Sequence, residues 1–217
     1  MDAHEEAHAA RLAAAAPRKA AAAEIPRLAA LLAAAFAADP VMRWGFREGA
    51  GLAGALNAYF TYALTRQCAQ HDAMFVAPGF QAASVWLPPS GLSSLSIPAW
   101  RMALMLPTLL KITGFSRLGR AAALGEAMEK HHPPEPPHWY LFFFGVDPAM
   151  QGKGVGSAIL EATLAKIDAE GMPAHLDNSN PRNTRLYERH GFRVVTEYRA
   201  RKDAPPIWGM WRDARRA

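Results

Sequence analysis

The sequence predicts a single α+β domain built around a mixed β-sheet, and three observations support this fold class. The chain has 217 residues, which fit one medium domain or at most two small ones. Apolar residues make up 51% of it and charged residues 20%, the balance of a globular domain rather than of a disordered tail. The last third alternates strand, helix, strand, helix, strand and strand patterns, which places one βαβ unit at the centre of the sheet.

The N-terminal region is predicted to be helical. Residues 1–16 are rich in alanine and lack an aromatic anchor, so we expect a flexible tail there, as a frayed helix or disorder. A single domain is expected over residues 17–217. Residues 24–38 carry apolar side chains at helical spacing, and Asp39-Pro40 stops the predicted helix.

The middle of the chain combines a helix, a hairpin and a helical insertion. The expected elements are a helix over residues 52–70, strands over residues 73–77 and 81–87, and extra helices within residues 90–137. Pro78-Gly79 is turn chemistry that favours an antiparallel hairpin, and Gly114 is expected to separate two helices.

The C-terminal third gives the clearest pattern. The expected elements are strands over residues 138–146, 174–178, 192–198 and 207–211, and helices over residues 154–170 and 181–190. The first of these strands is a continuous apolar and aromatic run, which indicates burial on both faces. Asn180 is expected to cap the second helix, with Pro181 at its first position.

Charge and hydropathy limit the partners and the location. Lys and Arg number 24 and Asp and Glu 19, giving a formal charge of +5 that suits an anionic small molecule. The basic residues do not form a stripe with aromatics, so no nucleic-acid partner is expected. Charges and a proline interrupt the apolar run over residues 97–112, and the N-terminus lacks a secretory pattern. We therefore expect no membrane contact and a cytoplasmic location.

The sequence predicts no metal site. Cys68 is the single cysteine of the chain, so it has no partner for an intramolecular disulfide. It also lacks neighbouring Cys and His residues at the spacing of a structural zinc site. A small buried side chain is the expected role of Cys68.

A glycine-rich turn is the segment with the most chemical content. Gly152, Gly154 and Gly156 lie where a predicted strand passes into a predicted helix. Small residues there let backbone N–H groups and the positive helix end face an anion, which predicts a phosphate site. A Walker A loop is excluded because Gly154, not Ser or Thr, follows Lys153. A dinucleotide site stays a lesser alternative, with Ser157 in place of the third glycine.

Two motifs together resemble one family. Gln151-x-x-Gly154-x-Gly156 resembles the pyrophosphate signature of the GCN5-related N-acetyltransferase (GNAT) superfamily, and Asn183-x-x-x-Tyr187 resembles the family's helix that ends in Gly-Phe. Two motifs in this order are more specific than either alone. Residues 138–210 are similar to the puromycin N-acetyltransferase-like bacterial members. The resemblance covers the last third of the chain.

The resemblance implies a fold, a cofactor and roles for residues. The fold is a mixed, mostly antiparallel sheet, splayed between its fourth and fifth strands and flanked by helices, and the cofactor is acetyl-CoA. By resemblance, the pyrophosphate meets backbone N–H groups of Gln151, Gly152, Lys153, Gly154, Val155, Gly156 and Ser157. The pantetheine arm pairs with Gly145, Val146 and Asp147. Asn183 orients the cofactor, and Tyr187 acts as general acid.

The base and the acceptor are left more open. Asp177 stands where the puromycin-type members carry a glutamate, so it is a candidate base acting through water. His138, which we expect to be an exposed polar residue at the start of a strand, is the second candidate, and the enzyme could also use no base. The expected acceptor is a primary amine of a small molecule, attacked within a ternary complex. Five aromatic residues could floor its pocket: Trp44, Tyr59, Tyr62, Trp86 and Trp100.

Other interpretations are kept beside the acetyltransferase. A family member that binds acyl-CoA without turnover is one, and a nucleotide-dependent oxidoreductase is another. Intact Asn183 and Tyr187 favour the enzyme. The oligomeric state is expected to be a monomer or a homodimer, and the role of residues 90–137 is open.

Overall fold

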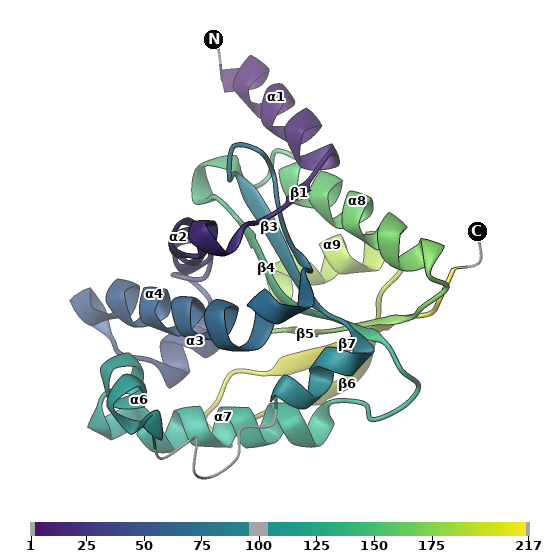
Figure 1. Ribbon diagram of the computed structural model, residues 1–217. Coiled ribbons are helices and arrows are strands. Elements are labelled where there is room, and N and C mark those ends of the chain that lie inside the picture. The colour runs from purple at the N-terminus through teal and green to yellow at the C-terminus, as the bar shows by residue number, and fades with distance from the viewer. Residues whose placement is uncertain (1–2, 96–103, 216–217) are drawn as a thin grey trace.

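A computed structural model describes residues 3–95 and 104–215 and shows one mixed sheet with helices on both faces (Figure 1). The strands are β1 (Arg18–Lys19), β2 (Met74–Val76), β3 (Ala82–Leu87), β4 (Trp139–Val146), β5 (Ala174–Asn178), β6 (Arg193–Tyr198) and β7 (Ile207–Arg212). They lie in the order β1-β2-β3-β4-β5-β7-β6, and only β4 and β5 run parallel among the paired strands described. The predicted fold class and hairpin are confirmed.

The helices follow the predicted pattern with small shifts. They are α1 (Ala3–Ala15), α2 (Ile25–Ala35), α3 (Pro40–Gly45), α4 (Leu52–Ala63), a π-turn (Leu64–Cys68), α6 (Leu106–Thr113), α7 (Leu118–His131), α8 (Val155–Ala169) and α9 (Thr184–Arg189). Short 3-10 turns cover Ala22–Glu24, Gly49–Gly51, Ala69–His71, Pro89–Leu95, Phe115–Arg117, Pro148–Met150 and Pro181–Asn183. Gly114 has a φ of 67° and separates α6 from α7, as the sequence predicts.

Two hydrophobic clusters hold the sheet between its helices. On one face, α2 and α4 bury Leu28, Leu32 and Phe60 against Phe143 of β4. On the other face, α8 buries Leu160 and Leu164 among side chains that include Leu176 of β5. Burial on both faces explains the unbroken apolar run of β4.

Strands β4 and β5 pair for only part of their length. The register joins Trp139 to Ala174, Tyr140 to His175 and Leu141 to Leu176, and it ends there in the described part of the chain. Beyond Leu141, β4 continues to Val146 with only β3 beside it. The splay implied by the family resemblance is therefore present.

The N-terminal residues differ from the flexible tail that the sequence predicts. Residues 3–15 form α1, which lies along α8 (Figure 1). Ala10 and Ala14 are buried in a cluster with Val155 and Ile159 of α8. Alanine lets two helices approach closely, so a segment without large apolar residues still has a packing surface.

Residues 90–137 contain the helices that the sequence predicts there. Helices α6 and α7 are the extra helices expected within residues 90–137, while residues 96–103, including Trp100, lie outside the described part. Within the residues described, no helix has the length and hydropathy needed to cross a bilayer.

Substitution of Gly145 by Ala should destabilise the domain. A Cβ there would lie 2.8 Å from Leu32 Cδ2 and 3.1 Å from Ala35 Cβ, so α2 would have to move off β4. Overpacking of this kind costs about 1–3 kcal/mol in the free energy of unfolding, which chemical denaturation measures.

Gly54→Ala is the matched control for this prediction. Gly54 lies in α4, and a Cβ there meets nothing within 4 Å, so the substitution should instead stabilise by up to about 1 kcal/mol. Equal effects of the two substitutions would contradict the close approach of α2 to β4.

Candidate functional site

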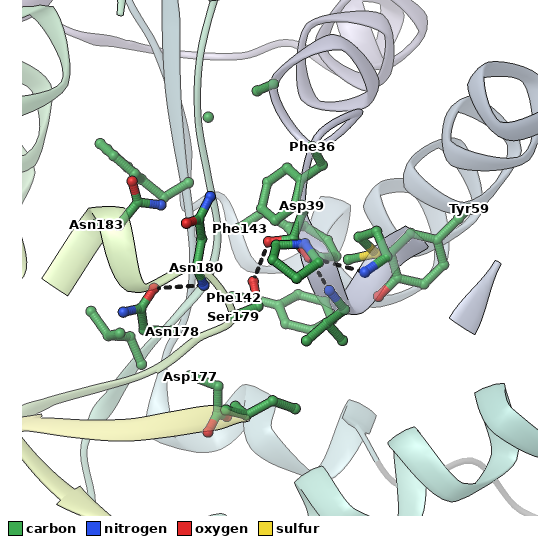
Figure 2. Close-up of a pocket in the computed structure, with 18 of the residues that line it drawn as sticks. Phe36, Asp39, Tyr59, Phe142, Phe143, Asp177, Asn178, Ser179, Asn180 and Asn183 are labelled. Atoms are coloured by element: carbon green, nitrogen blue, oxygen red, sulfur yellow. Dashed lines mark hydrogen bonds between the residues drawn. The ribbon is translucent and has the colours of Figure 1, made fainter. Parts of the chain in front are cut away.

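A large cavity opens where β4 and β5 diverge. Its volume is about 1870 Å³, and α2, α3, α4, α7 and α9 complete its walls. Its lining includes the aromatic residues Phe36, Tyr59, Tyr62, Phe142, Phe143 and Tyr187 and the polar residues Asp39, Asp177, Asn178, Ser179, Asn180 and Asn183. Figure 2 shows Asp39 hydrogen-bonded to Ser179, with Tyr59 on one side and Asn183 on the other.

The open edge of β4 offers a backbone donor. The Asp147 N–H donates to Gln81 O at 2.8 Å on the β3 side. Because successive residues of a strand direct their backbone groups to opposite sides, the Val146 N–H faces the side from which β5 has departed. Gln151 Nε2 donates to the Val146 carbonyl at 3.1 Å on this side. Of the three residues predicted to pair with pantetheine, Val146 has its amide toward the opening.

The glycine turn is shaped by backbone constraints. Asp147 accepts a hydrogen bond from the Ala149 N–H at 2.8 Å, which fixes the exit from β4. Gly152 and Gly154 have φ values of 75° and 80°, a region that other residues rarely adopt. Gly156 lies so close to β4 that a Cβ would be 3.0 Å from Val146 Cγ2. These positions need glycine for the turn and for the packing of α8.

The beginning of α8 is the predicted phosphate site. Gln151, Gly152, Gly154, Gly156 and Ser157 line the cavity, and Gly154 is the N-cap of this helix of 15 residues. The first N–H groups of a helix have no intrahelical acceptor, so they point out of the helix N-terminus, toward solvent or a ligand. The side chains of Lys153 and Val155 do not line the cavity among the described residues, and Val155 is buried against α1.

Asn183 and Tyr187 lie together as their spacing predicts. The Asn180 side chain accepts from the Arg182 N–H at 3.1 Å and caps the turn that leads into α9, as expected. Both Asn183 and Tyr187 line the cavity. Tyr187 is 6% exposed and packs edge-on against Phe144 and Phe192. Burial raises the pKa of its hydroxyl above the usual range, so it is protonated at neutral pH.

Asp177 lines the cavity between two tyrosines. Its Oδ2 accepts from the Tyr140 hydroxyl and its Oδ1 from the Tyr198 hydroxyl, both at 2.9 Å. Burial raises the pKa of Asp177, and the two hydrogen bonds oppose that shift. Each carboxylate oxygen therefore accepts one tyrosine hydroxyl, and each still has a second lone pair.

His138 does not match its predicted place. We expected an exposed strand end and a second candidate base, but His138 is fully buried and does not line the cavity among the described residues. Its ring contacts His132, His175 and Trp211 instead. The sequence pattern could not show this, because His175 comes from the neighbouring strand.

Only some of the aromatic residues expected in the acceptor pocket line the cavity. Tyr59 and Tyr62 line the cavity, and Trp100 lies outside the described residues. Trp86 is buried on the face covered by α8. Trp44 donates to Asp203 at 3.1 Å away from the lining.

Asp39 is a cavity residue that the sequence interpretation missed. Asp39-Pro40 was expected only to stop a helix, but Asp39 caps α3 through the Val41 and Met42 N–H groups, each at 2.9 Å. Ser179, which follows β5, donates to its other oxygen at 2.5 Å (Figure 2). An Asp before Pro is a known helix-start signal, so α3 could have been predicted; its contact with Ser179 could not.

Comparisons with known proteins agree on one family. Residues 111–192 match the Acetyltransferase (GNAT) family. A mycothiol acetyltransferase of Propionibacterium freudenreichii is 36% identical over 63 residues, which are 28% of this chain and 20% of that protein. An uncharacterised N-acetyltransferase of Schizosaccharomyces pombe is 39% identical over 54 residues, 25% of this chain and 22% of that protein. The matches span about a fifth of these curated relatives.

A solved structure extends the likeness to the whole fold. It is described as histone acetyltransferase HPA2 and related acetyltransferase from Corynebacterium glutamicum, with 24% identity and a TM-score of 0.64. The likeness covers 93% of this chain and 97% of that one. The two chains share one fold from the N-terminal helices to the last strand pair.

The buried carboxyl of Asp39 should give stability a measurable pH dependence. Burial raises its pKa, while the hydrogen bonds from Ser179 and two amides oppose the shift. A raised folded-state pKa means that the folded protein holds the proton more tightly, so stability is lost as pH rises. The unfolding free energy of wild type minus that of Asp39→Asn should fall as pH rises above about 4, the usual pKa of an aspartate.

Asp203→Asn provides a control of opposite sign. The exposed Asp203 accepts from Trp44, which lowers its pKa, so its contribution is lost as pH falls. Denaturant titrations at several pH values measure both differences. A wild-type minus Asp39→Asn difference that rises with pH would contradict the buried environment of Asp39.

Proposed function

We propose that this chain transfers an acetyl group from acetyl-CoA to a primary amine of a small molecule. The match of residues 111–192 to the GNAT family and the fold shared with a solved acetyltransferase support this proposal. The observation that carries this proposal is the opening between β4 and β5, with the N-terminus of α8 at one end and Tyr187 on its wall. Bound acetyl-CoA would supply a thioester carbonyl that an amine can attack directly.

Backbone groups would hold the cofactor. The N–H groups from Gln151 to Ser157 are proposed to bind the pyrophosphate, since the turn and the helix start direct them together. The Val146 N–H is proposed to meet the acyl arm at the open edge of β4, flanked by Gly145 and Asp147. Asn183 would orient the arm through its side-chain amide.

Tyr187 is the proposed general acid. A tyrosine hydroxyl carries its proton at neutral pH, and burial raises the pKa of Tyr187 further. Tyr187 lines the same cavity as Val146 and Asn183. A positioned donor of this kind contributes about 100-fold or more to the rate. It would deliver the proton to the departing thiolate.

The cavity walls support an amine with an apolar body. Tyr59, Phe142 and Phe143 give it aromatic walls, while Asp39 and Asp177 are carboxyl groups within the lining. Aromatic and acidic side chains together suit an ammonium group on an apolar molecule. Asp177 stays the proposed proton acceptor, reached through water or through a tyrosine hydroxyl. Our predictions for location and assembly stay the same: a cytoplasmic protein that is a monomer or a homodimer and has no nucleic-acid partner.

Calorimetry with acetyl-CoA, followed by a thiol-release assay with a panel of amines, tests the proposal. We expect binding of one acetyl-CoA per chain and thiol release with at least one amine. The Gly154→Val variant should lose binding, because its φ of 80° excludes a branched residue and the turn would change. Binding without release by any amine would support the non-catalytic sensor, and binding of NADH instead would support the oxidoreductase.

Replacement of Tyr187 by Phe should separate turnover from binding. The phenyl ring keeps its contacts with Phe144 and Phe192 but has no proton to donate, so kcat should fall about 100-fold while acetyl-CoA affinity stays within a factor of about 2. Stopped-time thiol assays and calorimetry measure the two quantities. An unchanged kcat would remove Tyr187 from the acid role.

A further inference from the structure

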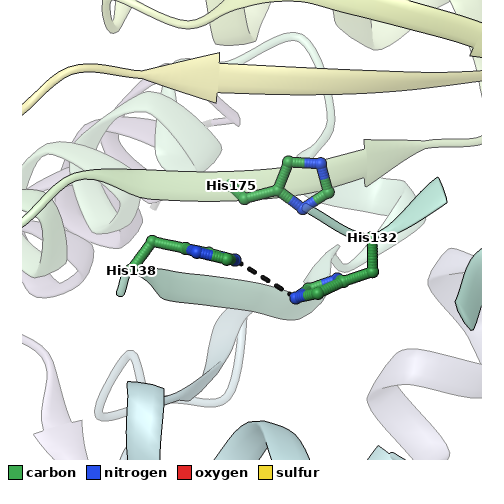
Figure 3. Close-up of side chains that lie close together, drawn as sticks. All are labelled: His132, His138 and His175. Atoms are coloured by element: carbon green, nitrogen blue, oxygen red, sulfur yellow. Dashed lines mark hydrogen bonds between the residues drawn. The ribbon is translucent and has the colours of Figure 1, made fainter. Parts of the chain in front are cut away.

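Three histidine side chains from separate segments lie close together near the start of β4. His132 follows the last residue of α7, His138 precedes β4, and His175 lies in β5 (Figure 3). One ring nitrogen from each falls within 4.8 Å of the others. His138 and His175 are fully buried, and His132 is half-buried. We call these residues the three-histidine cluster.

The ring of His138 is oriented like a metal ligand. His138 donates from Nδ1 to the Pro136 carbonyl at 2.8 Å, which leaves its Nε2 lone pair pointing to the cluster. This Nε2 accepts a hydrogen bond from His132 Nε2 at 3.1 Å, which a bound metal ion would replace (Figure 3). A carbonyl that holds the outer nitrogen of a histidine is the usual support behind a metal-binding imidazole. In a tetrahedral zinc site, two ligand nitrogens lie about 3.3 Å apart, close to this separation.

His175 supplies an independent observation. Both of its ring nitrogens are buried and have no hydrogen-bond partner in the described part of the chain. A buried polar group normally has a partner, so an orphaned imidazole beside two others requires an explanation. A bound cation would satisfy one of its nitrogens.

We propose that the three-histidine cluster binds one divalent transition-metal ion, with zinc as the best match. Imidazole nitrogens suit zinc, and three of them leave a fourth position for water. The most distant nitrogens must approach by about 1.5 Å to reach tetrahedral spacing. His175 also borders a surface groove with Glu135 and Pro136.

The metal ion would have a structural role and would take no part in acetyl transfer. It would tie the end of α7 and the loop before β4 to β5, next to the point where the two strands begin to diverge. The cluster does not include Tyr187, Val146 or the glycine turn, although His132 also lines the cavity of the candidate site. Its test measures zinc binding rather than thiol release, so its outcome is distinguishable from that of the proposed function.

Metal binding to untagged, chelator-treated protein tests the inference. Zinc should bind at one ion per chain in competition with a chromophoric chelator, and the thermal midpoint should rise on its addition. Cobalt(II) should give visible d–d bands of a tetrahedral complex. The His132→Ala variant should bind zinc at least 10-fold more weakly, since this half-buried ligand can be removed with little loss of packing.

His131→Ala is the matched control. His131 is the adjacent histidine, hydrogen-bonded to the Ala127 carbonyl and stacked on Tyr198 outside the cluster, so its removal should leave zinc affinity within about 2-fold. A second ligand variant, His175→Gln, should behave like His132→Ala if it folds. Absence of stoichiometric zinc binding in wild type, or equal affinity in wild type and His132→Ala, would overturn the proposal.

Discussion

The parting of two neighbouring strands is the constraint on which the site depends. Parallel strands normally satisfy each other's backbone groups along their whole length, but β4 and β5 stop pairing at Leu141 and Leu176. The remaining five residues of β4 keep β3 on one side and present donors and acceptors on the other. An extended ligand can therefore pair with this open edge in place of a strand. Helices α2, α3 and α7 surround the gap without filling it, which leaves the cavity.

Close packing keeps the gap open. Gly145 lets α2 lie against β4 on one face, and Gly156 lets α8 begin against the same strand on the other. Asp39 then links α3 to Ser179 after β5, so a partly buried hydrogen bond connects the two sides of the opening. Glycine thus has two functions in this region: a left-handed turn at Gly152 and Gly154, and the absence of a side chain at Gly145 and Gly156.

Much of the fold was predictable because its signals are local. The apolar run of β4, the cap at Asn180 and the break at Gly114 are each set by residues a few positions apart, and all appear in the structure. The paired spacing of Asn183 and Tyr187 was sufficient to place both on the cavity wall.

What the sequence interpretation missed depends on contacts between distant segments. The Ser179–Asp39 bond spans 140 residues, and the three-histidine cluster joins a helix end, a linker and a strand. His138 was expected at an exposed strand end because nothing near it in sequence covers it; His175 and Trp211 do so from other strands. The packing of α1 was missed for a related reason, since alanine carries little hydrophobic signal while allowing helices to approach closely.

The position of α1 matters to anyone who shortens this protein. Alanines of α1 cover Val155, the first residue of α8. The Cδ atom of Arg11 lies 3.2 Å from the position that a Cβ on Gly154 would take. Deletion of α1 would therefore uncover the glycine turn at Gly154 and expose apolar side chains of α8 beside it. The first helix belongs with the domain when its boundaries are drawn.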